Sequence, residues 1–221
     1  MKSTLMNMTA VLFGITLVAS AGVGAVNMIT AEPIAAAEQA AKVAALNGVL
    51  PAFDQTSSEV QTIDDMPITV YTATSGDQVV GYAVETMSKQ GFGGTINLMV
   101  GFTPAGEVIN VNVLKQSETP GLGTKMADEG NSLIGSIKGQ NLAQKKLVDG
   151  KLAVRKDGGD VDALTAATIS SRAYVDAINR AWMAYRSAAT GTAPADVASG
   201  ATTAAEDQTN EPEVQKGGQN E

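Results

Sequence analysis

The chain opens with a long stretch of apolar residues that carries no charge. No charged residue occurs between Ser3 and Ala31, and most side chains from Leu5 to Met28 are apolar. A helix that spans a bilayer needs about 20 such residues, and it tolerates the glycines found in this stretch. The pattern therefore predicts a transmembrane anchor over residues 1–30.

A cleaved signal peptide is the alternative interpretation of this segment. Residues 19–21 (Ala-Ser-Ala) fit the small-residue cleavage pattern. However, only Lys2 precedes the apolar run, and the run continues to about Met28; both features favour an uncleaved anchor. In either case the rest of the chain leaves the cytoplasm. The orientation follows from the preference of basic residues for the cytoplasmic side of a membrane span. Lys2 precedes the span, and Glu32 and Glu38 follow it, which predicts a cytoplasmic N-terminus.

Beyond the anchor, the periodicity changes from helical to alternating. The Ala-rich residues 31–48 predict a helical stalk, which Pro33 opens and Asn47–Gly48 closes. We expect it to continue the membrane helix outward, as a stalk or as the first element of the domain. Four β-strands are then predicted: residues 68–74 are rich in β-branched side chains, residues 95–102 are strongly apolar, and apolar and polar positions alternate over residues 79–87 and 108–114. Short turn sequences separate these strands, so we expect an antiparallel meander.

The pattern after these strands returns to helical spacing. Short helices or loops are expected over residues 121–128 and 132–144, and a short strand over Leu152–Arg155. Apolar side chains then recur at helical spacing from Thr165 to Ala188, which predicts one long helix. Strands followed by packing helices give an α+β fold for a domain that covers residues 49–189.

Composition limits what this domain can do. The chain has 221 residues, a formal net charge of -8 and no run of Lys and Arg, which argues against nucleic-acid binding. It has no Cys and no His, which excludes disulfides, iron–sulfur clusters, thiolate zinc sites and His-based catalysis, and we expect no metal site. Any redox chemistry therefore needs an organic cofactor. Residues 190–221 are polar, acidic and free of aromatic side chains, which predicts a disordered tail.

Three short segments are candidates for chemistry. They are Gly91–Gly94 (Gly-Phe-Gly-Gly), Ser117–Gly123 (Ser-Glu-Thr-Pro-Gly-Leu-Gly) and Asp162–Ser171 (Asp-Ala-Leu-Thr-Ala-Ala-Thr-Ile-Ser-Ser). The third lies at the start of the long helix, where free N–H groups and the helix dipole favour a phosphate. Each segment also has a purely structural explanation, as a bulge, a turn and a helix N-cap respectively.

Taken in order, these segments resemble the FMN-binding domains that carry a covalent flavin. They are most similar to the G subunit of the Rnf-type ion-translocating electron transport complex. The C subunit of the sodium-translocating NADH:quinone reductase shares the domain and is the alternative. The resemblance extends from Met6 to Tyr185 and includes the single N-terminal span. Few insertions between Glu85 and Glu118 favour the Rnf-type protein.

This resemblance implies an electron-transfer subunit rather than a complete enzyme. Such a subunit lies in the bacterial inner membrane, contacts membrane lipid and carries its FMN domain outside the cytoplasm. It relays electrons among the other membrane subunits of a complex that oxidises reduced ferredoxin with NAD and couples the reaction to ion movement. The second hypothesis is a non-redox structural subunit with an empty flavin domain. A third, an extracytoplasmic solute-binding domain, lacks a cluster of charged or aromatic ligands.

The resemblance also implies roles for individual residues. Thr168 matches the threonine that a flavin transferase joins to the FMN phosphate, with FAD as the donor, and Asp162 matches the leading acid of the motif. Thr165 would cap the helix and leave Thr168 free for FMN. The residues also expected around the cofactor are Thr165, Ala166, Ala167, Glu118, Thr119, Gly121, Leu122 and Gly123.

The sequence departs from the family pattern at two positions. Family members often have Gly where Ala166 stands, so an extra methyl group is expected to narrow the pocket slightly. They often have His where Ser117 stands, so any role of that His is absent here. Neither departure removes the acceptor hydroxyl of Thr168.

Overall fold

The apolar N-terminal stretch forms the first part of one helix, α1 (Leu5–Val49), in the computed structural model, which describes residues 5–191. Within this range α1 is the one helix that is long and apolar enough to cross a membrane. Its length and composition fit a single span. Lys2, on which the predicted orientation rests, lies outside the described residues.

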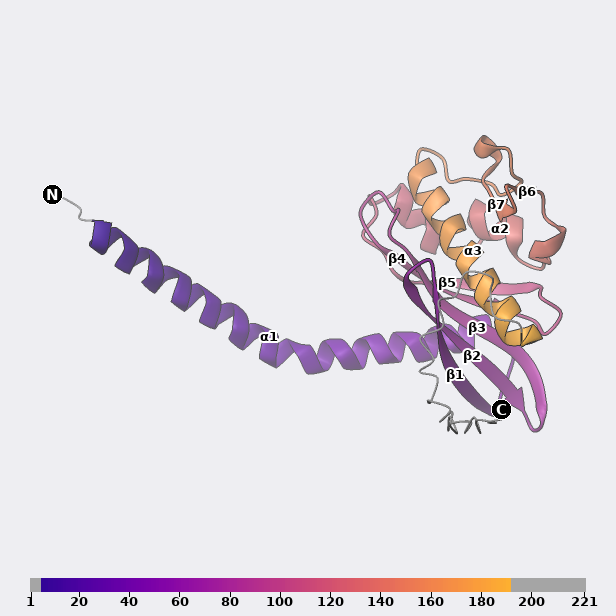
Figure 1. Ribbon diagram of the computed structural model, residues 1–221, viewed down its shortest axis with the longest axis horizontal. Coiled ribbons are helices and arrows are strands. Elements are labelled where there is room, and N and C mark those ends of the chain that lie inside the picture. Colours follow the sequence, from indigo (N-terminus) through magenta and orange to yellow (C-terminus); the bar gives the residue numbers. More distant parts are fainter. Residues whose placement is uncertain (1–4, 192–221) are drawn as a thin grey trace, which may run out of the picture.

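The stalk continues the membrane helix outward, as expected, because α1 runs through Pro33 without a break. The prediction that Pro33 opens a new helix is therefore wrong. A proline inside a helix removes one backbone hydrogen bond and crowds the preceding turn, which kinks the helix without necessarily ending it. Figure 1 shows that α1 changes direction along its length, as a proline kink would produce.

Five antiparallel strands follow α1 and form one sheet in the order β1–β2–β3–β4–β5 (Figure 1). They are β1 (Gln55–Ile63), β2 (Met66–Ser75), β3 (Gln78–Ser88), β4 (Ile96–Phe102) and β5 (Val108–Lys115). The last four confirm the predicted meander. Together with the helices described below, they also confirm the α+β class.

The first strand is not indicated by the sequence pattern. Only Gln61 and Ile63 of β1 are buried, because β1 is an edge strand and most of its side chains face solvent. It nevertheless pairs with β2 along its whole length. The two residues that connect the strands, Asp64 and Asp65, have φ angles of 50° and 57°. Positive φ at both positions is the geometry of a type I′ hairpin turn, which matches the twist of the strands.

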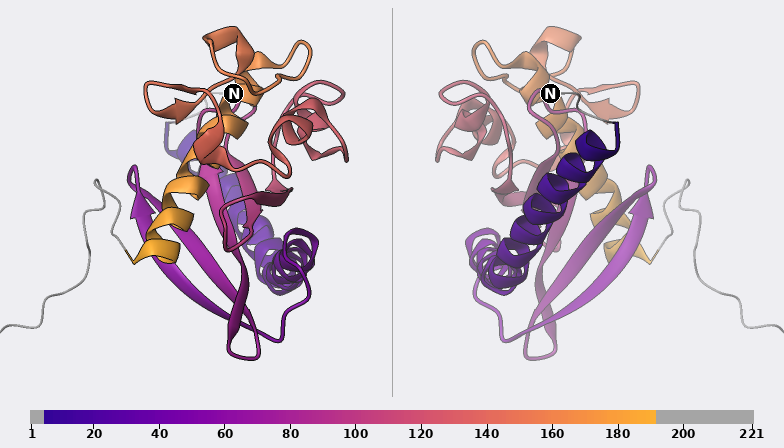
Figure 2. Two further views of the ribbon diagram at one scale, coloured as in Figure 1. Left: turned by 90° about the vertical axis from the view of Figure 1, so that its right-hand side faces the viewer. Right: turned by 90° about the vertical axis from the view of Figure 1, so that its left-hand side faces the viewer.

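Helices cover the two faces of this sheet. Figures 1 and 2 show α3 (Thr168–Thr190) along one face and the last turns of α1 against the other. The side chains of β4 alternate accordingly. Leu98 and Val100 belong to the core under α3, whereas Met99 belongs to a second, smaller core with Ala45 and Val49 of α1.

The end of α1 is fixed to the sheet by close packing at a glycine. A Cβ atom on Gly101 of β4 would lie 1.8 Å from the carbonyl oxygen of Val49, so a larger residue cannot fit without moving α1. Lys42 adds an ion pair of 2.9 Å with Glu85 of β3. The last turns of α1 therefore move with the domain as one packed unit.

Short elements connect β5 to α3. They are the 3-10 helices η1 (Gly123–Ala127), η2 (Leu142–Gln144) and η3 (Arg155–Asp157), the helix α2 (Ser132–Ile137) and the paired strands β6 (Leu147–Val148) and β7 (Lys151–Leu152). The short strand predicted over Leu152–Arg155 is therefore only partly correct, since β7 ends at Leu152. The long helix begins at Thr168 rather than Thr165. Nearly all of the predicted tail, residues 192–221, lies outside the described residues.

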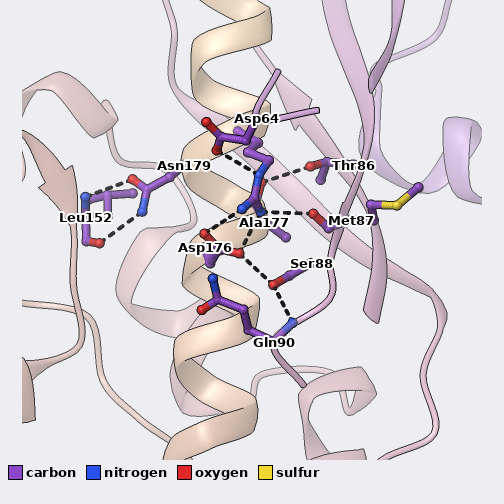
Figure 3. A network of polar contacts seen from close by, with 10 residues as sticks. Asp64, Thr86, Met87, Ser88, Gln90, Leu152, Asp176, Ala177 and Asn179 are labelled. Atoms are coloured by element: carbon purple, nitrogen blue, oxygen red, sulfur yellow. Dashed lines mark hydrogen bonds and ion pairs between the residues drawn. The ribbon is translucent and has the colours of Figure 1, made fainter. Parts of the chain in front are cut away.

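A buried arginine ties α3 to the sheet. The guanidinium of Arg180 donates to Asp176 on its own helix at 2.6 and 2.9 Å. It also donates to Asp64 of the β1–β2 turn at 3.0 Å and to the carbonyl oxygen of Met87 at 3.1 Å. Asp176 accepts a further hydrogen bond from Ser88 at 2.6 Å (Figure 3). This network fixes α3 against the end of β3, where the chain leaves the sheet.

Candidate functional site

A cleft of about 440 Å³ lies where the three segments singled out in the sequence meet. The first segment contributes Phe92 to its lining. The second contributes Thr119, Leu122 and Gly123, and the third contributes residues 166–170. The volume falls in the range typical of small-molecule sites. The fold therefore gathers at one end of the sheet the loop after β3, the loop after β5 and the start of α3.

The start of α3 offers free backbone donors beside Thr168. Thr168 is the first helical residue. The N-cap residue before it is Ala167, whose methyl side chain accepts no hydrogen bond from the first turn of the helix. Among the described residues, the N–H groups of Thr168, Ile169 and Ser170 have no hydrogen-bond acceptor. Such groups, at the positive end of the dipole of a 23-residue helix, favour an anion. The hydroxyl of Thr168 thus lies next to a site that suits a phosphate.

Thr165 does not cap this helix, contrary to the prediction. It is exposed in a turn that precedes the helix, in which the N–H of Ala167 donates to the carbonyl oxygen of Leu164 at 3.2 Å. Ser171 closes this turn instead. Its Oγ accepts from the N–H of Leu164 at 2.9 Å and donates to the carbonyl oxygen of Ala167 at 2.8 Å. Because of this turn, the helix begins only at Thr168, and Thr165 lies outside it.

Ala166 adopts a left-handed backbone conformation with a φ of 60°. This conformation costs an L-residue about 1–2 kcal/mol, whereas glycine adopts it freely. A glycine would therefore fit the backbone conformation at this position better than alanine does.

Replacing Ala166 with glycine is expected to raise the free energy of unfolding by about 0.5–1 kcal/mol. The relief of strain exceeds the extra entropy that glycine loses on folding. Urea denaturation of the full chain in detergent measures the change. Ala167→Gly is the matched control, because Ala167 has a φ of -133° and carries no such strain. A loss of stability in Ala166→Gly would contradict the strain argument.

Glu118 lies beneath the cleft and connects its parts. Its side chain is buried, with 5% of the residue exposed. One carboxylate oxygen accepts a hydrogen bond from the N–H of Gly93 at 3.0 Å, and the other accepts one from Ser170 Oγ at 2.5 Å. Glu118 therefore joins the Gly91–Gly94 segment to the first turn of α3.

The residues predicted to surround a cofactor do not all line the cleft. Those that line it are Thr119, Leu122, Gly123, Ala166, Ala167 and Thr168. Thr165 and Gly121 lie outside the lining, and Glu118 lies behind it. The carboxylate of Asp162 instead forms an ion pair with Arg155, and its N–H donates to Ser136 Oγ at 3.1 Å. The contacts of Asp162 are thus with the protein, where they hold the segment that leads to α3.

Three apolar side chains at the cleft are exposed, and only one of them was predicted to contact a cofactor. Phe92 is 68% exposed, Ile169 49% and Leu122 40%; of these, Leu122 was predicted. An aromatic residue between glycines was a usable signal for Phe92, because an exposed Phe on a loop adds little to the core. Ile169 gave no such signal, since its spacing fits the apolar face of the helix.

No Lys or Arg lines the cleft among the described residues. The nearest arginine along α3, Arg172, is paired with Asp157 of η3 at 2.7 Å. The hydrogen bond from Arg172 holds the pKa of the Asp157 carboxyl below its usual value. A phosphate in the cleft would therefore depend on backbone donors rather than on a basic side chain.

A second cavity, of about 470 Å³, lies along β5 beside η1 and α2. Its polar lining includes Asn110, Asn112, Asp128 and Asn131. It contains none of the residues predicted from the sequence. The smaller cleft at Thr168 is the better candidate site because all three segments meet there.

Comparison with known proteins identifies the family to which the domain is similar. The FMN-binding domain family matches residues 91–183, which include all three segments. The chain is 34% identical over 190 residues to the G subunit of the ion-translocating oxidoreductase complex of Shewanella loihica, covering 81% of this chain and 89% of that protein. The corresponding protein of Shewanella amazonensis is 31% identical over 192 residues, with 81% and 87% covered. That of Vibrio cholerae is 36% identical over 162 residues, with 69% and 77% covered.

Proposed function

Because this chain belongs to the family of G subunits of ion-translocating oxidoreductase complexes, we propose that it is a membrane-anchored flavoprotein subunit that relays electrons through FMN held at Thr168. The observation that carries this proposal is the meeting of Thr168, the free N–H groups of α3 and an apolar rim in one cleft. The chain supplies no His or Cys. Bound FMN would therefore supply the redox chemistry, and the protein would hold and orient it.

The cleft fits the two chemically different ends of FMN. The N–H groups of Thr168, Ile169 and Ser170 suit its phosphate. The exposed side chains of Phe92 and Leu122 suit its planar, largely apolar ring system. A polar anchor next to an apolar surface is the usual composition of a cofactor site.

The proposed attachment is a phosphoester on the side chain of Thr168. A flavin transferase would use FAD: the bond formed joins Thr168 Oγ1 to the phosphorus of the FMN half, and the phosphoanhydride bond to AMP breaks. AMP leaves with the bridging oxygen, and the hydroxyl proton is released. A covalent tether suits a domain outside the cytoplasm, where lost FMN is not replaced. Thr168 is partly buried and lines the open cleft, which is the side from which a transferase would reach it.

The direction in which α1 leaves the domain supports partners in the membrane. From Val49, packed on Gly101, the helix runs past Glu85, which pairs with Lys42, toward the end of β5, where Lys115 lies 4.0 Å from Glu38. That end of the sheet carries the cleft. At 1.5 Å per residue, the ten residues from Glu38 back to Met28 span about 15 Å. The cleft would therefore lie close to the lipid surface and to the other subunits, outside the cytoplasm.

Covalent flavin on the purified chain tests this proposal. The full chain, expressed with and without a flavin transferase and purified in detergent, is denatured and examined by absorbance and intact mass. We expect flavin absorbance that stays with the polypeptide and one added FMN mass, both dependent on the transferase. The structural-subunit hypothesis instead predicts the mass of the bare polypeptide under both conditions.

A further inference from the structure

Glu118 is a buried acid without a basic partner. Among the described residues, no Lys or Arg forms an ion pair with it. Its two oxygens accept from Gly93 N–H and Ser170 O–H, and its own N–H donates to Gln116 at 2.7 Å. Two accepting oxygens are the hydrogen-bonding pattern of an ionised carboxylate. A buried charge held only by neutral donors is costly, and proteins keep few of them.

Three glycines lie around Glu118: two of them leave room for its carboxylate, and the third leaves room for the backbone just before it. A Cβ atom on Gly91 would lie 2.6 Å from one Glu118 oxygen, and a Cβ atom on Gly123 would lie 2.8 Å from the other. A Cβ atom on Gly93 would lie 1.8 Å from the carbonyl oxygen of Ser117, the residue before Glu118. The glycines of the first two segments thus shape a compartment for one acidic side chain.

The compartment shares a wall with the cleft. Gly123 and Ser170 both line the cleft. Ser170 donates a hydrogen bond to the Glu118 carboxylate, and a side chain on Gly123 would collide with it. Ser170 also lies in the first turn of α3, so the positive end of the helix dipole offsets part of the cost of burying the charge. Only Gly123 and Ser170 therefore separate the carboxylate from the space proposed for FMN.

From this arrangement we infer that Glu118 sets the redox potential of the flavin, as a fixed negative charge behind the cleft wall. The inference rests on the proposed function. Each electron that the flavin accepts adds negative charge, and a neighbouring carboxylate in a poorly solvated site opposes that addition. Glu118 therefore lowers the midpoint potential. Its hydrogen bonds to Gly93 and Ser170 keep the charge at a fixed distance from the cleft.

The variant Glu118→Gln separates the charge from the packing. The amide oxygen can accept from the N–H of Gly93, and the amide nitrogen can donate to Ser170 Oγ, which is able to accept. Both contacts and the volume are thus retained, while the charge is lost. For a charge about 10 Å away at a protein-like dielectric, Coulomb's law gives about a tenfold change in a one-electron equilibrium. This corresponds to about 59 mV toward more positive potential.

The test is a redox titration of the full-length, flavinylated protein in detergent. Dithionite supplies the electrons and is oxidised as the flavin is reduced, and absorbance gives the midpoint potential. The midpoint potential of Glu118→Gln is expected to be more positive than that of the wild type. The midpoint potential of Glu118→Asp, which keeps the charge, is expected to stay closer to the wild-type value. A wild-type or more negative potential in Glu118→Gln would overturn the inference, because a purely structural acid has no reason to act on the potential in this direction.

A second variant covers the case in which Glu118→Gln does not fold or does not take up flavin. Ser170→Ala removes a donor whose dipole offsets part of the charge, so its midpoint potential is expected to shift to more negative values. An unchanged or more positive potential in Ser170→Ala then overturns the inference. Intact mass is measured first for every protein. A wild-type chain without flavin contradicts the proposed function itself, whereas a flavinylated chain with an insensitive potential contradicts only the role of Glu118.

Discussion

Replacing Thr168 with valine is expected to abolish covalent flavin on this chain. Valine has nearly the shape of threonine and lacks the hydroxyl that would form the phosphoester. Thr168 lines the cleft at the first position of α3, so the valine side chain occupies the same space without disturbing the helix. Co-expression with a flavin transferase, followed by intact mass and in-gel flavin fluorescence, measures the loss. We expect a fall from nearly full occupancy to none.

Two matched variants separate this effect from general damage to the site. Thr165→Val makes the same chemical change three residues away at an exposed position outside the cleft, and it should leave flavin occupancy unchanged. Thr168→Ser restores a hydroxyl and should recover part of the occupancy. Flavin that remains covalently bound to Thr168→Val, or that disappears in Thr165→Val alone, would place the attachment at another residue.

The fold was predictable where the pattern of side chains is local. The strands from β2 to β5 are rich in apolar and β-branched residues because each packs against a core, and β4 contributes side chains to the cores on both faces of the sheet. β1 could not be predicted in this way, because it is an edge strand whose side chains are mostly exposed and polar. The continuation of the membrane helix into the stalk was expected, but the position of Pro33 inside the helix was not, because proline can either open a helix or kink it.

The three segments that form the site could be predicted from the sequence, but the way they pack against one another could not. The order of the segments indicated Thr168 and the residues from Glu118 to Gly123. It could not indicate that Glu118 is buried behind the cleft or that Thr165 lies outside it. Both facts depend on contacts between segments far apart in the chain, such as the hydrogen bonds of Glu118 with Gly93 and Ser170. Nor could the order of the segments indicate that Asp162 lies outside the lining of the cleft and pairs with Arg155.

The second large effect is expected from replacing the buried Arg180 with methionine. This change keeps most of the side-chain volume but leaves Asp176 and Asp64 without their cation and removes the hydrogen bond from Arg180 to Met87 O. Removing one partner of a buried ion pair typically costs about 3–5 kcal/mol. Asp64 is largely exposed and can be solvated, so we expect about 3 kcal/mol here, at the low end of that range. This is a large part of the roughly 5–15 kcal/mol that is typical of a folded domain.

Chemical denaturation of the full chain in detergent measures this loss through Trp182, the single tryptophan of the sequence. Trp182 packs against Phe102 and Tyr185 and therefore reports whether α3 is docked on the sheet. Arg172→Met is the matched control, because Arg172 lies on the same helix but pairs with Asp157 in solvent, where ion pairs contribute little. Equal stability of the two variants would contradict the argument.

Replacing Arg180 should also weaken flavin binding in the cleft, because the same hydrogen-bond network holds the loop that carries Phe92. Asp176 accepts from Ser88 Oγ at 2.6 Å, and Ser88 Oγ accepts from the N–H of Gln90 at 3.3 Å (Figure 3). Without Arg180, Asp176 loses its charge partner and is free to turn toward solvent, which releases Ser88. We therefore expect lower flavin occupancy in Arg180→Met even at temperatures where the domain is folded. Full occupancy would show that Glu118 alone suffices to hold the loop.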